Sequence, residues 1–350
     1  MLAMVWSVLL VLGAFYLLSI VSEDFFVPAI DRLAKKLGLS SDAAGATLLA
    51  IGSSAPELFT STFAVFGTQT GSGDIGAGTI VGSAIFNVLV IIGASSMFRV
   101  VKLQWQPVLR DMGFYILTIL LLFWAFSDGK INILEAGIFV LVYMVYVIAA
   151  IYWRKLFKYQ DVDAIELIEN NPVNALGRLS RRLVGLVIPS PDKFPRLYVL
   201  SFVMSILVIA GLSHQLVHHV IVIADYFSIN PTFLALTVLA AGTSLPDLIG
   251  SIIVAKQGRG DMAVSNALGS NIFDVLFGLG MPWLAYIVWK GGEITVGTEN
   301  LIASIFLLFA TVVALIFLML IRNWKIGHKS GIILIGIYFL YLAYVLSTVL

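Results

Sequence analysis

The sequence contains no cysteine and few charged residues. Of its 350 residues, 12% are charged and 60% are hydrophobic. A soluble protein of this length needs far more polar surface, so the composition indicates an integral membrane protein. Without cysteine there is no disulfide, no thiolate nucleophile and no thiolate metal site. The net charge of +1 argues against a nucleic-acid partner.

Long apolar segments recur along the whole chain. A helix needs about 20 apolar residues to span a bilayer. Segments near this length lie at 1–22, 43–66, 78–98, 111–127, 132–153, 197–224, 231–255, 263–289, 300–321 and 330–350. The first segment has no basic residues before it, unlike a signal peptide, so we count it as a helix of the mature protein. We therefore expect an all-α protein with ten transmembrane helices.

The basic residues predict the orientation of these helices. Lysine and arginine are enriched in loops on the inner side of a membrane. With the N-terminus outside, 19 of the 21 basic residues fall in inner loops, and only Lys130 and Lys290 lie outside. Arg110 is counted among the inner-loop residues. This distribution predicts that both termini face out.

Two stretches of the sequence repeat each other. GSSAPELFTS, beginning at Gly52, resembles GTSLPDLIGS, beginning at Gly242, so that Glu57 corresponds to Asp247. Further on, GSAIFNVL at 82–89 matches GSNIFDVL at 269–276. The second copy begins five predicted helices after the first, and this odd offset gives the repeats opposite orientations in the membrane. Duplication for close helix packing is the alternative explanation, but it does not account for acids beside both prolines.

Inverted repeats with broken helices are typical of secondary transporters, which bind their substrate near the membrane midplane. Pro56 and Pro246 each leave a carbonyl four residues earlier without its helical donor. Helical spacing places hydroxyls, these carbonyls and a carboxylate on one face. The polar residues so grouped are Ser53, Ser54 and Glu57; Thr243, Ser244 and Asp247; Ser83 and Asn87; and Ser270, Asn271 and Asp274.

Every candidate ligand atom in these groups is an oxygen, which suits hard cations such as calcium and sodium. Glu57, Asp247 and Asp274 together carry up to three negative charges, which cations or protons must balance in a medium of low dielectric. Protonated acids bonded to hydroxyls are the structural alternative. No cofactor is expected, because the ions are substrates.

Two further features have alternative interpretations. GSGD at 71–74 and GRGD at 258–261 share a motif with aspartyl intramembrane proteases, although helix N-capping is the expected role of Asp74 and Asp261. The loop at 154–195 contains VNALGRLSRRLV, which predicts an amphipathic helix on the inner membrane surface.

The two repeats, over 43–98 and 231–283, resemble the alpha-repeats of the cation/calcium exchanger superfamily, and among its members the potassium-dependent sodium/calcium exchanger group. The resemblance implies two inverted five-helix halves, 1–153 and 196–350, joined by the cytoplasmic loop at 154–195. It also implies that Glu57 and Asp247 are the central calcium ligands. The other implied ligands are Ser53 and Thr243 for calcium; Ser54, Ser83, Ser244 and Ser270 for sodium; and Asn87 and Asp274 in the middle of the site.

The expected function is sodium/calcium antiport by alternating access, in the plasma membrane of a microbe because large regulatory domains are missing. The resemblance implies that the aspartate at position 274 permits potassium co-transport. A calcium/proton antiporter is the nearest alternative, since protons also discharge carboxylates. An intramembrane aspartyl protease is a remote one. The sequence predicts no oligomeric state.

Overall fold

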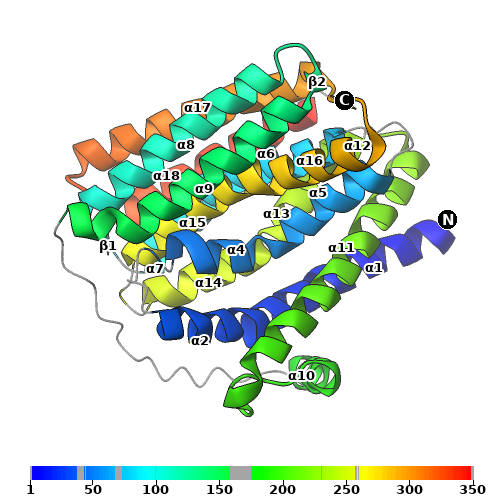
Figure 1. The fold of residues 1–350 in the computed structure, drawn as a ribbon, viewed down its shortest axis with the longest axis horizontal. Helices are drawn as coiled ribbons and strands as arrows, with labels where there is room; N and C mark the ends of the chain where they lie inside the picture. The colour runs from blue at the N-terminus through cyan, green and yellow to red at the C-terminus, as the bar shows by residue number, and fades with distance from the viewer. Residues whose placement is uncertain are drawn as a thin grey trace.

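Long helices lying side by side make up the structure, a computed structural model of the chain (Figure 1). It describes residues 2–37, 43, 45–67, 73–98, 100–157, 175–229, 231–256, 258 and 260–347. Within these ranges, nine helices are long and apolar enough to cross a membrane, and the bent pair Gly45–Ser53 and Ala55–Gly67 brings the number to ten. Each of the ten predicted apolar segments overlaps one of them.

The first half of the chain contains helices interrupted by short π-helical turns, labelled η. Its elements are α1 Leu2–Val21, η1 Ser22–Phe26, α2 Val27–Leu37, η2 Gly45–Leu49, α4 Ala50–Ser53, α5 Ala55–Gly67, α6 Asp74–Phe86, η3 Asn87–Ile91, α7 Ile92–Phe98, α8 Trp105–Ala125 and α9 Ile133–Leu156.

The second half repeats much of this order. Its elements are α10 Ala175–Val187, the 3-10 helix η4 Pro195–Leu197, α11 Tyr198–Phe227, α12 Pro231–Leu234, η5 Ala235–Leu239, α13 Ala240–Thr243, α14 Leu245–Lys256, α15 Gly260–Phe273, η6 Asp274–Leu279, α16 Gly280–Lys290, α17 Thr298–Ile321 and α18 His328–Ser347.

Two short antiparallel strand pairs lie at opposite ends of the bundle. β1 Val101–Lys102 pairs with β4 Lys325–Ile326, and β2 Lys130–Ile131 pairs with β3 Ile294–Thr295. Figure 1 places β1 and β2 at opposite ends of the long axis. The sequence did not predict these pairs, which add two-residue sheets to an otherwise helical fold. We call the two ends of the bundle the β1·β4 end and the β2·β3 end.

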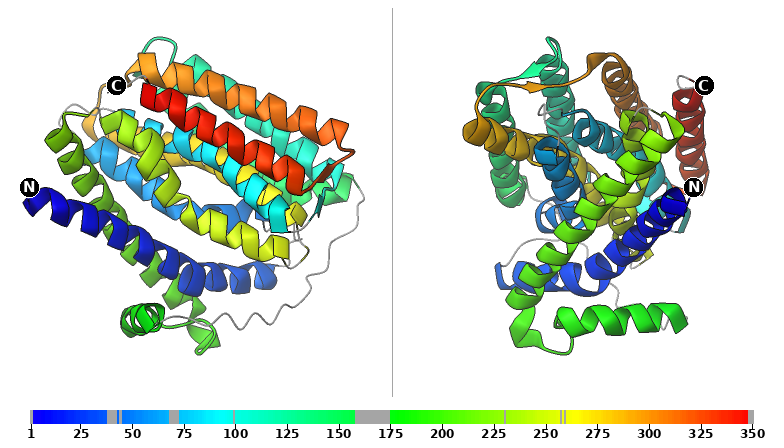
Figure 2. Two further views of the ribbon diagram at one scale, coloured as in Figure 1. Left: turned by 180° about the vertical axis from the view of Figure 1, so that it is seen from behind. Right: turned by 90° about the vertical axis from the view of Figure 1, so that its right-hand side faces the viewer.

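Both ends of the described chain lie at the β2·β3 end. α1 begins there and α18 ends there, as Figures 1 and 2 show from opposite sides. α6 also begins at this end, because the amide of Gly73 donates to the carbonyl of Thr295 in β3, 3.0 Å away. α15 begins at the β1·β4 end, where Gly260 packs against Val101. α6 and α15 therefore run in opposite directions.

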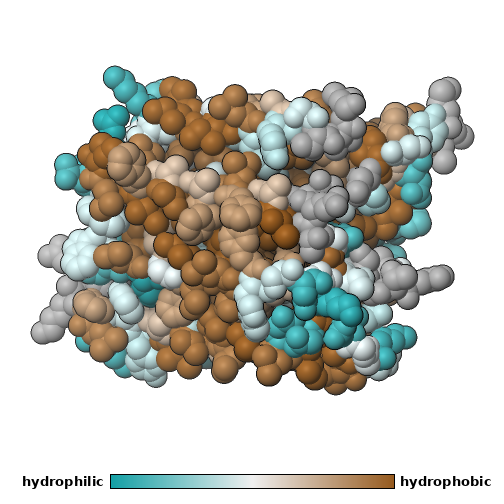
Figure 3. Space-filling model, turned by 90° about the horizontal axis from the view of Figure 1, so that it is seen from above, coloured by the Kyte–Doolittle hydropathy of each residue, from teal (hydrophilic) through white to brown (hydrophobic). Residues whose placement is uncertain are grey.

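The helices form a group around α6 and α15 and a separate pair. α1 packs against α11, and the apolar core that includes Leu18, Phe26 and Leu216 also contains residues of α5 and η5. Figures 1 and 2 show this pair on one side of the molecule and α8, α9, α17 and α18 on the other. The outer face seen in Figure 3 is mostly apolar. Exposed apolar side chains such as Phe306 and Phe317 on α17 are what contact with lipid requires.

Glycines let each repeat pack closely against the other. A Cβ atom on Gly82 of α6 would stand 2.3 Å from the carbonyl oxygen of Leu236 in η5. A Cβ on Gly269 of α15 would stand 2.7 Å from the carbonyl oxygen of Ala46 in η2. Only glycine fits such contacts without a shift of the backbone. The matching glycines thus bring the second helix of each repeat against the broken helix of the other.

α8 begins earlier than its hydropathy predicts, at Trp105 instead of residue 111. The added part includes Arg110, whose charge is paired inside the helix, since Arg110 Nε lies 2.8 Å from Asp111 Oδ1 and both side chains are fully buried. Tyr146 of α9 also donates to Asp111 Oδ1, at 3.1 Å. Assigning Arg110 to an inner loop was therefore wrong. A paired charge can enter a helix interior that an isolated one would avoid.

The predicted amphipathic helix is present as α10. Leu179 and Leu183 are each more than half exposed, while Arg181 Nε lies 2.7 Å from Asp24 Oδ2 of η1. α10 therefore exposes an apolar face, and the ion pair of Arg181 with Asp24 joins its charged face to the bundle beside α1. Residues 158–174 of the predicted loop at 154–195 lie outside the described residues.

Candidate functional site

Two helices are broken at matching positions. α4 ends and α5 begins around Ser54, whose φ and ψ are −89° and 9°, and α13 ends and α14 begins around Ser244, at −82° and 4°. The prolines two residues later explain these breaks, because proline cannot donate to the preceding turn. The first pair is bent by 53°, whereas Pro231–Lys256 passes as one span.

π-helical turns occur at four matching positions. η2 and η5 precede the two breaks, while η3 begins at Asn87 and η6 begins at Asp274. A π turn leaves helical carbonyls without their usual donors and often marks a functional site. The two residues predicted for the middle of the site thus each open such a turn.

The two acids beside the prolines are fully buried and close to one another. Glu57 Oε1 accepts a hydrogen bond from Ser244 Oγ at 3.0 Å, and Ser83 Oγ lies 3.0 Å from Ser244 Oγ, to which it can donate in turn. Asp247 Oδ1 accepts from Ser270 Oγ at 3.0 Å. Glu57 and Asp247 interact electrostatically. The structure therefore gathers side chains of both repeats around two carboxylates.

Ser53 and Thr243 cross between the repeats. Ser53 lies beside Asp247, and Thr243 beside Glu57. Each hydroxyl donates to the carbonyl four residues earlier, with Ser53 Oγ 2.7 Å from the oxygen of Leu49 and Thr243 Oγ1 2.9 Å from that of Leu239. With their hydrogens used in this way, the hydroxyl oxygens keep lone pairs for a cation.

The third carboxylate, Asp274, is also fully buried and interacts electrostatically with Glu57 and Asp247. Ser54 and Ser83 lie close to it, yet neither of its oxygens accepts a hydrogen bond of good geometry from the described residues. Asn87, its counterpart in the first repeat, donates through Nδ2 to Asn271 Oδ1 at 2.9 Å. The predicted ligands of both repeats therefore meet in one region.

Several buried oxygens in this region have no hydrogen-bond partner within the described part of the chain. They are Ser54 Oγ, Glu57 Oε2, Asn87 Oδ1, Asp247 Oδ2 and both carboxylate oxygens of Asp274. A buried polar atom without a partner costs about 1–3 kcal/mol, and more for a charged group. Cations compensate such a cost directly, and an all-oxygen set suits sodium or calcium.

The acids are not packed into a single cluster. Among the described residues, no three His, Cys, Asp or Glu side chains stand close enough together to hold one metal ion. An ion here would therefore be bound by one or two carboxylates completed with hydroxyl, amide and carbonyl oxygens. The three carboxylates predicted for the site therefore occupy neighbouring positions in it and do not form one cluster.

Three residues at the edge of the site, Asn266, Ser251 and Tyr115, were not among the predicted candidates, whereas Asn271 was grouped with Asp274. Asn266 Nδ2 donates to Asp247 Oδ1 at 3.3 Å and to Ser251 Oγ at 3.1 Å. Asn271 Nδ2 donates to the hydroxyl of Tyr115 at 2.8 Å. The spacing of Asn266 and Ser270, one helical turn apart, was a readable signal, but nothing in the sequence pointed to Tyr115, which comes from α8.

The Gly-x-Gly-Asp aspartates do not meet. Asp74 lies at the β2·β3 end, where its carboxylate accepts from the amide of Gly297, and Asp261 lies at the β1·β4 end, where it accepts from the amide of Met262 at 2.9 Å. Asp74 is the first residue of α6 and its contact with Gly297 is a tertiary one, so N-capping of its own helix was the wrong role. Two aspartates at opposite ends cannot form the catalytic pair of a protease.

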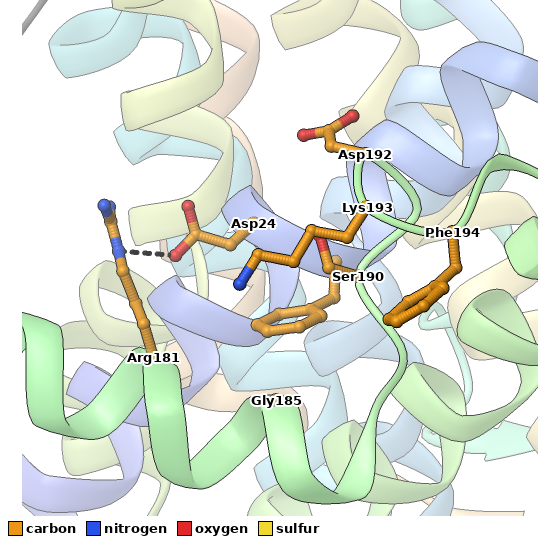
Figure 4. Close-up of a pocket in the computed structure, with 8 residues that line it drawn as sticks. Asp24, Arg181, Gly185, Ser190, Asp192, Lys193 and Phe194 are labelled. Atoms are coloured by element: carbon orange, nitrogen blue, oxygen red, sulfur yellow. Dashed lines mark ion pairs between the residues drawn. The ribbon is translucent and has the colours of Figure 1, made fainter.

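A separate cavity of about 430 Å³ lies between η1 and α10 (Figure 4). Its lining residues are Asp24, Phe25, Arg181, Gly185, Ser190, Asp192, Lys193 and Phe194. Figure 4 shows the Asp24 and Arg181 side chains pointing toward each other, joined by their ion pair. None of the predicted ion ligands lines this cavity, so it is distinct from the candidate site.

Curated relatives match nearly the whole chain. Sodium/potassium/calcium exchanger 4 from Homo sapiens is 26% identical, with 95% of this chain and 80% of that protein covered. Sodium/potassium/calcium exchanger 3 from Rattus norvegicus is 28% identical, with 99% and 83% covered. Among solved structures, the sodium-calcium exchanger NCX_Mj has the same fold, with a TM-score of 0.61 at 22% identity over 97% of this chain and 99% of that one.

The family model described as "Sodium/calcium exchanger protein" matches residues 7–152 and 197–347. These two matched blocks contain every predicted ligand and leave out only the central loop and the extreme ends. The resemblance inferred from the repeats is confirmed. The chain belongs to the sodium/calcium exchanger protein family.

Proposed function

We propose that the protein exchanges sodium for calcium across a membrane, as an antiporter and not as an enzyme. The observation that carries this proposal is the group of buried carboxylate, amide and hydroxyl oxygens without hydrogen-bond partners, gathered where the two broken helices meet. Family membership supports it, since the relatives that match are named as exchangers of sodium and calcium.

The ligands are assigned by chemistry and position. Glu57 and Asp247 bind calcium, with help from oxygens of Ser53 and Thr243. Sodium uses overlapping positions, and Asn87 and Asp274 complete the middle of the site. The remaining sodium ligands are Ser54, Ser83, Ser244 and Ser270. All ten side chains are buried in the described structure.

Exchange follows from competition for the same charges. Calcium and sodium both need the carboxylates, so one occupant excludes the other. A site without ions leaves negative charges buried in a medium of low dielectric, which opposes crossing of the barrier. The occupied protein alternates between two openings by movement of the α1 and α11 pair against the rest, which the position of this pair on one side of the molecule supports (Figure 2).

The two halves, 1–153 and 196–350, are proposed to be inverted repeats, with both termini outside and the loop at 154–195 inside. The opposite directions of α6 and α15 support the inversion, and the common end at which α1 begins and α18 ends supports the placement of the termini. The orientation itself rests on the basic residues.

Potassium co-transport is proposed for Asp274. Its two oxygens without hydrogen-bond partners offer a third negative position beside Glu57 and Asp247. The sodium/potassium/calcium exchanger names of the relatives support this assignment. We further propose that the protein extrudes calcium from a microbial cell through its plasma membrane.

The test is calcium-45 uptake into liposomes that contain the purified protein and internal sodium, diluted into sodium-free buffer with proton gradients collapsed. Uptake that requires internal sodium supports the proposal, and added potassium tests the role of Asp274. Uptake indifferent to sodium but driven by a pH gradient would instead identify a calcium/proton antiporter. Passive flux that is far faster and needs no counter-ion would identify a channel.

A further inference from the structure

Asn87 lies beside the Asp247 carboxylate, and the orientation of its side-chain amide decides which of its atoms an ion can meet. Asn87 is fully buried, and its Nδ2 donates to Asn271 Oδ1 at 2.9 Å. Its Oδ1 has no hydrogen-bond partner among the described residues. A cation needs the oxygen of this amide and is repelled by its N–H groups. Whatever sets the orientation of Asn87 therefore sets whether this position binds an ion.

Asn271 is itself held in one orientation. Its Nδ2 donates to the carbonyl of Ala84 at 3.1 Å and to the hydroxyl of Tyr115 at 2.8 Å. The Ala84 carbonyl can only accept, so the nitrogen of Asn271 must face it. The oxygen of Asn271 then faces Asn87 and can accept only from its nitrogen. These hydrogen bonds are therefore satisfied by only one orientation of each of the two amides.

Comparison of the two repeats explains why only Asn87 needs an orienting partner. In the match of 82–89 with 269–276, Asn271 corresponds to Ala84, and Asn87 corresponds to Asp274. A carboxylate has two acceptor oxygens, so Asp274 needs no orienting partner. The amide of Asn87 has only one, and the orienting amide occurs only on the helix that faces it.

We propose that Asn271, held by the Ala84 carbonyl and the Tyr115 hydroxyl, is a positioning residue that turns the oxygen of Asn87 toward the transported ion. Neither Asn271 nor Tyr115 is required to touch the ion. Tyr115 reaches the site from α8, is fully buried, and keeps the second hydrogen of the Asn271 amide in place. This inference rests on the proposed function and assigns determinants of its ion affinity.

The test compares calcium KM and kcat for sodium-driven uptake, together with direct calcium-45 binding to the purified protein. Asn271→Ala is expected to raise the calcium KM about tenfold with little change in kcat. Tyr115→Phe is expected to raise it about threefold, since the Ala84 carbonyl still orients Asn271. Tyr146→Phe is the matched control, because it also removes a buried hydroxyl but one bonded to Asp111.

A second set of variants, made in the Asn87→Asp protein, distinguishes an orienting role of Asn271 from a role in packing. In Asn87→Asp the side chain no longer needs orienting and cannot donate to Asn271 Oδ1, so adding Asn271→Ala should not weaken calcium binding. An equal loss of calcium affinity in both backgrounds would overturn the proposal, as would a wild-type KM in Asn271→Ala. If Asn271→Ala does not fold, equal calcium affinities for Tyr115→Phe and Tyr146→Phe overturn it. Absence of sodium-driven uptake by the wild-type protein would reject the proposed function instead.

Discussion

The acids of the two repeats are held in different ways. Glu57 accepts its hydrogen bond from Ser244, a residue of the other repeat, at 3.0 Å. Asp247 accepts from Asn266 and Ser270, both in its own repeat, at 3.3 and 3.0 Å. The two donors to Asp247 Oδ1 therefore come from its own repeat, although Ser53 of the other repeat also lies beside this carboxylate. The position of Glu57 depends on how the two repeats meet, so movement between them would change its contacts first.

The same contrast appears around the rest of the site. The position of Asn266 in the second repeat corresponds to Thr79 in the first, three residues before the matched glycines. Thr79 Oγ1 donates to the carbonyl of Ile75, within its own helix, at 2.8 Å. The duplicated backbone thus places equivalent positions at one site, while the side chains that differ give each half its own chemistry.

Removal of either acid beside a proline should have the largest effect. Glu57→Gln and Asp247→Asn keep the shape but remove a negative charge, so sodium-driven calcium uptake should fall at least about 100-fold. Glu293→Gln is a suitable control, because Glu293 is half exposed and pairs with Lys130 at 3.1 Å. Exchange that survives in one of the two variants would show that the repeats contribute unequally.

Asp274→Asn should make the middle positions of the two repeats alike. We expect the monovalent-ion dependence of uptake to change strongly and the calcium KM to stay within about threefold. The reason is that Glu57 and Asp247 remain available to calcium. Uptake titrated with sodium and with potassium measures the change, and complete loss of calcium binding would contradict this division of roles.

Gly82→Ala and Gly269→Ala test the packing that the repeats share. The added methyl group would lie 2.3 Å from the Leu236 oxygen or 2.7 Å from the Ala46 oxygen, so each variant should lose about 1–3 kcal/mol of stability. Thermal unfolding in detergent measures the loss. Gly137→Ala, where a methyl group would meet no atom within 4 Å, should be neutral. A normal melting temperature for either packing variant would show that its close contact is not required.

Asn266→Ala should have the smallest effect, as it removes one of two donors to Asp247 Oδ1. The calcium KM should rise about fivefold, the size expected for one hydrogen bond to a charged group. Thr79→Ala should change it by less than about twofold, because that hydroxyl bonds only within its helix. Equal effects of the two substitutions on KM would show that Asn266 and Thr79 do not differ in their contribution to calcium binding.

Much of the fold was readable because membrane insertion imposes local rules. Ten apolar segments were predicted, and the errors lay where polar groups pair. α8 can include Arg110 because its charge is paired with Asp111, and hydropathy averaged over a window does not register such a pair. The strand pairs β1·β4 and β2·β3 join segments far apart in sequence, so no local pattern announces them.

The sequence by itself determined which residues are candidates for the ion site. Internal duplication marked Glu57 and Asp247, and proline placement marked the breaks, since both depend only on order along the chain. Only the tertiary structure decided which oxygen faces which. The pairing of Glu57 with Ser244, and the contact of Tyr115 with Asn271, join residues from different helices. Hydrogen bonds depend on distance and angle in space, and spacing along one helix does not specify them.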